Sequence, residues 1–241
     1  MKDPGAIPTQ ERLIVALDVE SPARARQLVE QLGDAIQFYK LGLQLFLAGG
    51  YFELADWLAG LGKKVFVDLK LFDVPNTVES AVRQLHGRQL SFLTVHGNDA
   101  ILEAACRGRD ESLKILAVTA LTSLDQRDME DLGFHTDLDR LVVSRARRAA
   151  HIGCDGVIAS GREVPALREA LGRAILIVVP GIRPRAAPDS DDQKRTVDVE
   201  EAFRRGADYI VVGRPIRQAA DPRAVATDMQ ARIARALASR S

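Results

Sequence analysis

The sequence predicts an α/β fold, a single-domain (β/α)8 barrel of the TIM type. Short β-branched apolar runs alternate with longer segments of helical periodicity along the 241 residues. Eight such units fit the roughly 250 residues that a barrel of this kind usually needs. No linker, composition break or low-complexity segment divides the chain. We therefore expect one domain over residues 1–241, with residues 1–10 as a poorly ordered N-terminal extension.

The eight apolar runs are the expected strands. Runs that are apolar on both faces are typical of parallel strands buried between a barrel interior and a layer of helices. In chain order they are Leu13–Asp18, Phe38–Leu41, Val65–Lys70, Phe92–His96, Ile115–Leu121, Gly156–Ser160, Ile175–Val179 and Tyr209–Gly213.

Amphipathic segments between the runs are the expected helices. In Leu138–Ile152 the apolar side chains recur on one face and the arginines lie on the other. Pro22–Leu32, Tyr51–Leu61 and Val199–Arg205 have the same character, and Asp221–Ser239 is expected to be a closing helix. An alternative architecture is a doubly wound open sheet, which would need a glycine-rich turn after its first strand. That turn is absent after the first run, so the barrel is preferred.

Composition limits the classes of partner. Lys and Arg together number 33, as do Asp and Glu, so the formal net charge is zero. This balance argues against broad binding to nucleic acid or to an anionic membrane surface. The longest apolar stretch, Ala174–Val179, is far shorter than the roughly 20 residues of a membrane span. Met1–Gln10 lacks the apolar core of a signal peptide, and Cys106 and Cys154 form no CxxC pair. A soluble cytoplasmic protein with reduced thiols is expected.

Charged side chains stand at the ends of the first three expected strands. Side chains alternate along Val65–Lys70, so Asp68 and Lys70 share one face and the opposite face is apolar. If the apolar face packs on the helices, these two charges point into the barrel at its C-terminal mouth. Asp18 ends the first strand, and Lys40 lies near the end of the second. Four charges are therefore expected to meet at one mouth.

A structural salt-bridge network would be the simpler explanation of any single pair among these four charges. Burial of charged groups is costly unless they pair, and apolar residues could fill the same space. Barrels of this class keep their active sites at the carboxyl ends of the strands. Four charges at that end therefore favour a functional site.

Three later loops bring polar side chains to the same mouth. Thr122 follows the fifth expected strand. Gly213 ends the eighth and Arg214 follows it, at a place where such barrels often bind phosphate through backbone N–H groups and a cation. The long polar loop after the seventh strand holds Arg183 and Gln193 near its two ends. A loop of that length is either a disordered surface segment or a lid, and these two side chains favour the lid.

Asp73 and Thr77 flank Pro75 in the segment after the third strand. Proline suits the first turn of a helix, and polar neighbours suit its cap. Capping alone would account for Asp73 and Thr77, so their spacing leaves a functional role open.

Together these motifs resemble the orotidine 5′-monophosphate decarboxylase family, which carries out the last step of de novo UMP synthesis. The likeness runs from Leu17-Asp18 to Gly213-Arg214, nearly the whole chain. Its most specific part is Asp68–Thr77, with the sequence Asp-Leu-Lys-Leu-Phe-Asp-Val-Pro-Asn-Thr. Pro180–Pro184, Asp192-Gln193 and Val212–Arg214 follow in the right order. Val74 is a conservative departure, because isoleucine is common there in the family.

The resemblance implies a catalytic role for the lysine between the aspartates. Lys70 would be the proton donor, flanked by Asp68 and Asp73, and Lys40 would complete an alternating array of charges. It also implies a homodimer, in which Asp73 and Thr77 reach across the interface into the partner's site.

The resemblance further implies the residues that hold the substrate, orotidine 5′-monophosphate. Asp18 and Lys40 would hold ribose hydroxyls, and Thr122 would meet the pyrimidine. The residues implied on the phosphate side are Arg183, Gln193, Gly213 and Arg214.

The residue types suit this reaction. Decarboxylation leaves an electron pair on ring carbon C6 that cannot delocalise into the π system, and no cofactor that could act as an electron sink is evident. The protein must supply an electrostatic partner and then a proton. Carboxylate neighbours favour the ammonium form of Lys70, whereas a Schiff-base lysine needs the reverse.

Two other functions are considered. A Mg²⁺-dependent sugar-phosphate decarboxylase or lyase, such as a ketogulonate-phosphate decarboxylase or a hexulose-phosphate synthase, shares the Asp-x-Lys-x-x-Asp stretch. That chemistry wants a further carboxylate for the cation, and the first strand offers only Asp18 and Glu20, so no metal is expected. A non-catalytic nucleotide-phosphate-binding barrel is the third candidate, but it would not need a lysine held between two aspartates.

Overall fold

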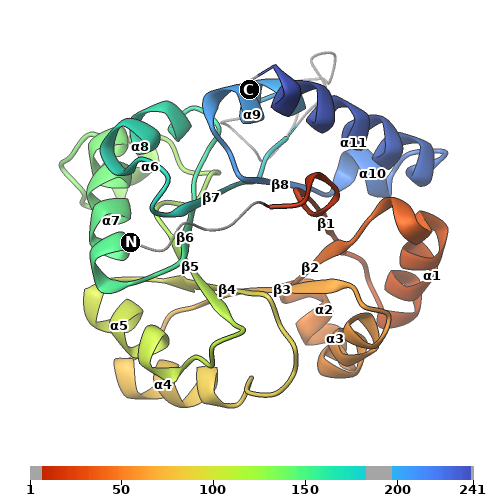
Figure 1. Cartoon of the computed structure of the whole chain (residues 1–241). Helices are drawn as coiled ribbons and strands as arrows, with labels where there is room; N and C mark the ends of the chain where they lie inside the picture. The colour runs from red at the N-terminus through yellow and green to blue at the C-terminus, as the bar shows by residue number, and fades with distance from the viewer. Residues whose placement is uncertain (1–6, 183–196, 240–241) are drawn as a thin grey trace.

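The computed structural model describes residues 7–182 and 197–239. Eight parallel strands form a closed barrel in the order β1 to β8, and helices surround it (Figure 1). Each strand pairs with its neighbour in sequence, and β8 pairs with β1 to close the ring. The predicted single-domain (β/α)8 barrel is confirmed, and the open-sheet alternative is wrong.

All eight expected strands are present, with ends that differ from the predicted ones by up to three residues. The strands are β1 Leu13–Ala16, β2 Phe38–Gly42, β3 Lys64–Leu71, β4 Phe92–His96, β5 Lys114–Val118, β6 Gly156–Ile158, β7 Leu176–Val179 and β8 Tyr209–Val212.

The described α-helices lie outside the strands (Figure 1). The α-helices are α1 Pro22–Leu32, α2 Leu43–Ala48, α3 Tyr51–Gly60, α4 Pro75–Arg83, α5 Asp99–Gly108, α6 Gln126–Asp131, α7 Leu138–Ile152, α8 Val164–Leu171, α9 Val199–Arg205, α10 Arg214–Arg217 and α11 Pro222–Ala238. Two 3-10 helices are η1 Thr9–Glu11 and η2 Gly33–Ala35.

Strand β5 is shorter than expected because a turn follows it. It ends at Val118, and the N–H of Leu124 donates to the carbonyl of Leu121 at 3.0 Å. Strand β1 ends at Ala16 rather than at the predicted Asp18. Both differences extend the loops at the carboxyl ends of the strands, where Asp18 and the residues after β5 stand.

Two apolar layers share the alternating side chains of the strands. The inner layer fills the barrel and includes Phe38, Phe66, Phe92 and Tyr209, with the Phe38 and Phe92 ring centroids 4.9 Å apart. The outer layer joins the other strand face to the helices, and Val67 belongs to it. Burying large aromatic side chains contributes roughly 1.5–3 kcal/mol each. Phe66 belongs to the inner layer and its neighbour Val67 to the outer one, which confirms the expectation that the two faces of β3 pack on different layers.

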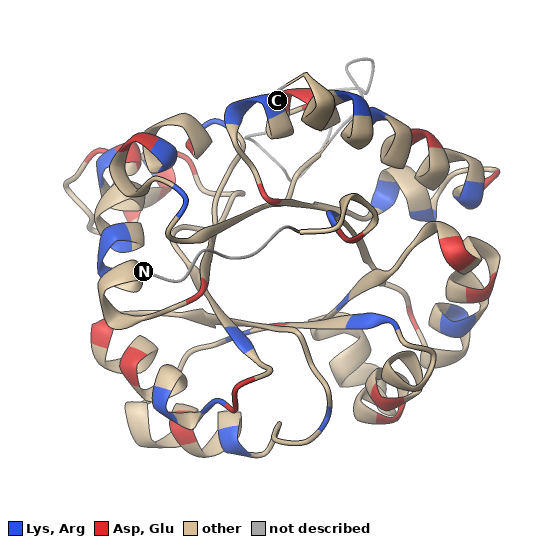
Figure 2. Cartoon of the chain, viewed as in Figure 1, with Lys and Arg blue, Asp and Glu red and all other residues tan. Residues whose placement is uncertain are grey.

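Local signals place the helix ends. Ser21 caps α1 by accepting from the N–H of Arg24, and Pro22 occupies the first turn. Asp137 caps α7, which ends at Gly153 with φ of 98°, a left-handed conformation that glycine adopts at low cost. Acidic and basic residues are interspersed along the surrounding helices (Figure 2).

Residues 7–10, which the sequence assigned to a poorly ordered N-terminal extension of residues 1–10, have a defined place in the structure. Thr9–Glu11 form η1, and Ile7 packs against the inner apolar layer. Glu11 pairs with Lys64, and the Gln230 amide donates to the carbonyl of Gln10 at 3.0 Å. These contacts hold residues 7–11 against the barrel and against α11. Residues 1–6 lie outside the described part.

No described helix combines the length and apolar character needed to cross a membrane.

Candidate active site

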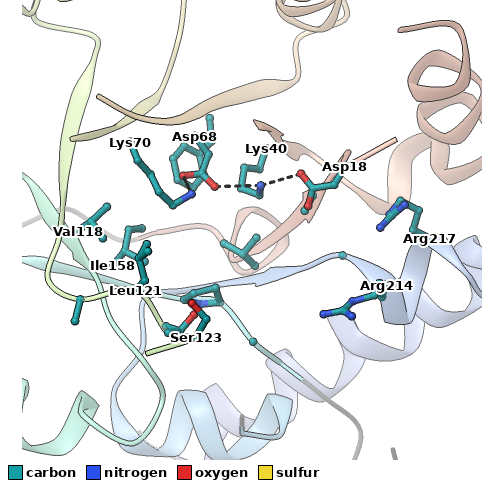
Figure 3. A pocket seen from close by; sticks show the side chains of 18 residues that line it. Asp18, Lys40, Asp68, Lys70, Val118, Leu121, Ser123, Ile158, Arg214 and Arg217 are labelled. Carbon is teal, nitrogen blue, oxygen red and sulfur yellow. Dashed lines mark hydrogen bonds and ion pairs between the residues drawn. The ribbon is translucent and has the colours of Figure 1, made fainter. Parts of the chain in front are cut away.

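A pocket of about 510 Å³ opens at the carboxyl ends of the strands. Its described lining comes from strands β1 to β3, from the ends of β5, β6 and β8, and from the segments after β1, β5, β7 and β8. This is the face at which barrels of this class carry out chemistry. Figure 3 shows that its charged side chains divide into a row at one side and two arginines at another.

The row of charges, which we call the charge array, consists of Asp18, Lys40, Asp68 and Lys70. The Lys40 amine lies 3.1 Å from Asp18 Oδ1 and 3.1 Å from Asp68 Oδ2, so it bridges the two carboxylates. The Lys70 amine lies 2.9 Å from Asp68 Oδ1. Negative and positive charges therefore alternate along the pocket wall. The structure brings together all four residues that the sequence placed at this mouth.

Two residues of the charge array are buried, so each needs an opposite charge beside it. Lys40 and Asp68 are each 9% exposed, and a buried charge is costly unless an opposite charge compensates it. Burial raises the pKa of Asp68, but the positive charges of Lys40 and Lys70 and the hydrogen bonds from Lys70 and Thr94 outweigh it and lower the pKa to about 2. Burial lowers the pKa of Lys40, yet Asp68 and Asp18 raise it above its ordinary value. Both groups are therefore charged at neutral pH.

Strand β3 reaches the pocket by an irregular path. Strict alternation of side chains along a regular strand predicts that Asp68 and Lys70 share one face. In the structure the pairing with β4 shifts between Val67 and Leu71, and Lys70 has φ of 48°, in the left-handed region. The predicted destination of the two side chains is correct, but the regular strand assumed for it is wrong.

The loop after β5 forms a second wall of the pocket. Thr122 is buried there, and Ser123 lies beside it. Val118 and Ile158 provide an apolar surface next to these hydroxyls. A flat ring with polar edges would match a wall of this kind.

The segment after β8 supplies cations. Gly213 and Arg214 line the pocket, as predicted, and so does Arg217 on the same short helix α10. Sequence reasoning missed Arg217, although its spacing of three from Arg214 places both on one side of a helix. The buried Nε of Arg217 has no hydrogen-bond partner among the described residues. We call this region the arginine end of the pocket.

A glycine that sequence reasoning also missed keeps room for the charge array. A Cβ on Gly42, at the end of β2, would lie 2.9 Å from Asp18 Oδ1 and 3.2 Å from the Lys40 amine. Any side chain there would press on this ion pair. The sequence shows only that a glycine follows Lys40-Leu41. It does not indicate that the Asp18 and Lys40 side chains lie against this position.

Asp73 and Thr77 are exposed and do not line the pocket of their own chain. Helix α4 begins at Pro75, as predicted, but its N-cap position, Val74, makes no side-chain cap. The Asp73 carboxylate accepts from the N–H of Val74 at 2.7 Å. Helix capping therefore does not account for this pair. Arg183 and Gln193, predicted at the phosphate side, lie outside the described residues.

No three His, Cys, Asp or Glu side chains group as metal ligands within residues 7–182 and 197–239. The two carboxylates of the pocket are instead joined through the Lys40 amine.

The fold and these side chains together define a (β/α)8-barrel enzyme with a charged pocket at the carboxyl ends of its strands. The family model described as orotidine 5′-phosphate decarboxylase / HUMPS matches residues 11–229. The chain belongs to this family.

Named relatives extend this similarity. A protein of Methylococcus capsulatus named orotidine 5′-phosphate decarboxylase is 60% identical over 227 residues, covering 94% of this chain and 93% of the relative. One of the same name from Stenotrophomonas maltophilia is 48% identical over 231 residues, covering 95% of each. The crystal structure of orotidine 5′-phosphate decarboxylase from Lactobacillus acidophilus superposes with a TM-score of 0.81 at 33% identity, covering 92% of this chain and 99% of that one.

Proposed function

We propose that this chain decarboxylates orotidine 5′-monophosphate to UMP and CO₂, the last step of de novo pyrimidine biosynthesis, without a cofactor. The observation that carries the proposal is the Lys70 amine, which lies 2.9 Å from the buried Asp68 carboxylate in the pocket. The chain's similarity to proteins named orotidine 5′-phosphate decarboxylase supports the same function. A cation fixed at this place is what the reaction needs.

Lys70 is proposed to act in two ways. The bond between C6 and the carboxylate carbon breaks, CO₂ departs, and the electron pair stays on C6. The Lys70 ammonium group stabilises that pair and then transfers a proton to C6. The resulting amine regains its proton from water. Asp68 and Lys40 are charged before substrate arrives, so the array needs no reorganisation during the reaction.

The arginine end is proposed to hold the phosphate. Among the described lining residues there are four cations, Lys40, Lys70, Arg214 and Arg217, against the two carboxylates of Asp18 and Asp68. The charge array is balanced within itself, and the two remaining cations, Arg214 and Arg217, lie at the arginine end. Guanidinium groups bind phosphate through charge-assisted hydrogen bonds, and Gly213 lines the pocket beside them.

The remaining roles follow from position. Asp18 and Lys40 lie between the reacting end and the arginine end, where ribose hydroxyls would lie (Figure 3). Thr122 lies on the wall opposite, where it can meet the pyrimidine edge. Arg183 and Gln193 are proposed as further phosphate-side residues on the strength of the resemblance.

We propose that the active unit is a homodimer in which Asp73 and Thr77 complete the partner's site. Both are exposed and outside their own pocket, and the exposed apolar side chains Phe72 and Val74 flank Asp73. Covering such side chains would favour association. The aspartate would add a second carboxylate beside Lys70.

Mixing two inactive variants tests the shared site. Because one hybrid site would receive neither defect, refolding Lys70→Ala and Asp73→Ala chains together should restore about a quarter of wild-type activity. The matched control mixes Lys70→Ala with Asp68→Ala, two residues of the same pocket, and should stay inactive. No restoration in the first mixture would mean that Asp73 does not serve the partner's pocket.

The metal-dependent alternative is not supported by the named relatives or by the pocket, in which a lysine amine already joins the two carboxylates. The test is the ultraviolet absorbance of orotidine 5′-monophosphate mixed with purified protein and EDTA. The proposed function predicts full turnover in EDTA. Loss of activity that Mg²⁺ restores would support the alternative, and binding without consumption would indicate a non-catalytic barrel.

We also propose a cytoplasmic location. The Cys106 and Cys154 sulfurs lie 3.7 Å apart as free thiols, which suits a reducing compartment.

A further inference from the structure

The strand that carries the catalytic lysine is bulged opposite a single residue. Phe66 and Val67 on β3 pair with Phe92 and Leu93 on β4, but the next pair is Leu71 with Val95. Three residues, 68–70, therefore stand opposite Thr94 alone. A bulge of this kind leaves backbone groups without their ladder partners and redirects the side chains of the bulged strand.

The hydroxyl of Thr94 replaces one of these lost partners. The backbone N–H of Lys70 donates to Thr94 Oγ1 at 3.0 Å. Lys70 has φ of 48°, a conformation that costs free energy for a residue with a side chain and persists only where its surroundings hold it. The Thr94 hydroxyl is therefore a restraint on the backbone that sets the direction of the Lys70 side chain.

The same hydroxyl fixes the carboxylate partner of the lysine. Thr94 Oγ1 donates its proton to Asp68 Oδ1 at 2.9 Å, and this oxygen also accepts from the Lys70 amine at 2.9 Å. The other oxygen, Oδ2, faces Lys40. A hydroxyl has one proton and two lone pairs, so it can accept from Lys70 and donate to Asp68 at the same time.

Thr94 does this without contacting the ligand space. It is fully buried, and it is not among the residues that line the pocket. In the sequence Thr94 is only a polar residue in the middle of the mostly apolar run Phe92–His96, which does not mark it as functional.

We propose that Thr94 is a positioning residue for the decarboxylation, because its hydroxyl joins the Lys70 backbone to the Asp68 carboxylate and so holds the lysine amine at the reacting carbon. This inference rests on the proposed function. A displacement of about 1 Å at a catalytic group can lower the rate about 100-fold. Loss of the hydroxyl should therefore affect turnover more than binding.

The test compares Thr94→Val, which keeps the shape and loses the hydroxyl, with Thr94→Ser, which keeps the hydroxyl. Thr94→Val should lower kcat roughly 10- to 100-fold, with KM for orotidine 5′-monophosphate and Kd for UMP within about threefold of wild type. Thr94→Ser should stay within about threefold of wild-type kcat.

Thr119→Val is the matched control. Thr119 is 1% exposed on the loop just after β5, and its hydroxyl donates to the carbonyl of Ile158 at 2.8 Å, away from the charge array. Its loss should lower Tm, as we also expect for the loss of the Thr94 hydroxyl, but should leave kcat within about twofold of wild type.

Wild-type kcat in folded Thr94→Val would overturn the inference, and so would Thr94→Ser as slow as Thr94→Val or an equal loss of kcat in Thr119→Val. If Thr94→Val does not fold, Thr94→Cys takes its place. The thiol is a weak donor and acceptor, so kcat should again fall by the amount expected for Thr94→Val. A wild-type protein without decarboxylase activity would instead contradict the proposed function.

Discussion

The two ends of the pocket solve different electrostatic problems. At the charge array, Asp18, Lys40, Asp68 and Lys70 neutralise one another through contacts of 2.9–3.1 Å. At the arginine end, Arg214 and Arg217 line the pocket on the short helix α10, apart from the charge array (Figure 3). The first end is organised by its own ion pairs, whereas the second presents two guanidinium groups to a ligand.

Under the proposed function, this difference separates chemistry from binding along one cavity. A balanced array contributes little net attraction to an anionic ligand, but it holds a cation in place for a charge that develops during reaction. Two arginines attract a phosphate strongly, but they lie apart from the lysine (Figure 3). Substitutions at the two ends should therefore change different kinetic constants.

The largest effect is expected for Lys70→Ala. It removes both the electrostatic partner and the proton donor of C6, so kcat should fall at least ~10⁴-fold. Isothermal titration with UMP should still show binding within about fivefold of wild type, because the arginine end is untouched. Lys64→Ala, at the opposite end of the same strand, is the matched control and should retain kcat. Substantial residual turnover in Lys70→Ala would show that another group is the acid.

Arg214→Ala should produce the next largest effect. Removing a charged partner of the phosphate is expected to lower kcat/KM roughly 100-fold or more and to weaken UMP binding in parallel. The native fold should persist, as circular dichroism would show. Steady-state kinetics with wild-type kcat/KM would remove Arg214 from the phosphate role.

Arg217→Ala provides a graded comparison at the same end. Its side chain also lines the pocket, at the far end of α10, so a loss of about tenfold in kcat/KM is expected. A loss confined to kcat would place Arg217 with the chemistry and would blur the distinction between the ends.

Acid titration tests the charge array by itself. The pKa of Asp68 is about 2 in the folded chain and 3.8 as its ordinary value, so its ionisation stabilises the fold above pH 3.8 and this contribution is lost as pH falls toward 2. The contribution is about 2 kcal/mol. In urea denaturation, the difference in unfolding free energy between wild type and Asp68→Asn should shrink by that amount between about pH 5 and about pH 2. A constant difference would mean that Asp68 is not stabilised as an anion.

The sequence was sufficient for the fold because the signal is repeated. Eight buried runs such as Tyr209–Val212 each read as a strand on their own, and an error at one end, as at β1, does not change the topology. The residues of the charge array were also predictable. Lys40, Asp68 and Lys70 interrupt apolar runs, where burial of an unpaired charge is costly.

The details that depend on a neighbouring strand were not predictable. In the bulge of β3 the hydroxyl of Thr94 on β4 accepts from the N–H of Lys70, and nothing in residues 64–71 indicates this contact. Gly42 matters only because the Asp18 side chain crosses it. Cys106 and Cys154 are 48 residues apart in sequence, yet their sulfurs lie 3.7 Å apart. Asp73 does not line the pocket of its own chain, so the role proposed for it requires a second chain that the sequence alone does not show.

The most direct test of the account is a crystal structure of the protein with UMP bound. The account predicts the Lys70 amine within about 3.5 Å of pyrimidine C6, with Asp68 still bonded to it and the phosphate against Gly213 and Arg214. A nucleotide bound with C6 turned away from Lys70, or with its phosphate at the charge array, would contradict it.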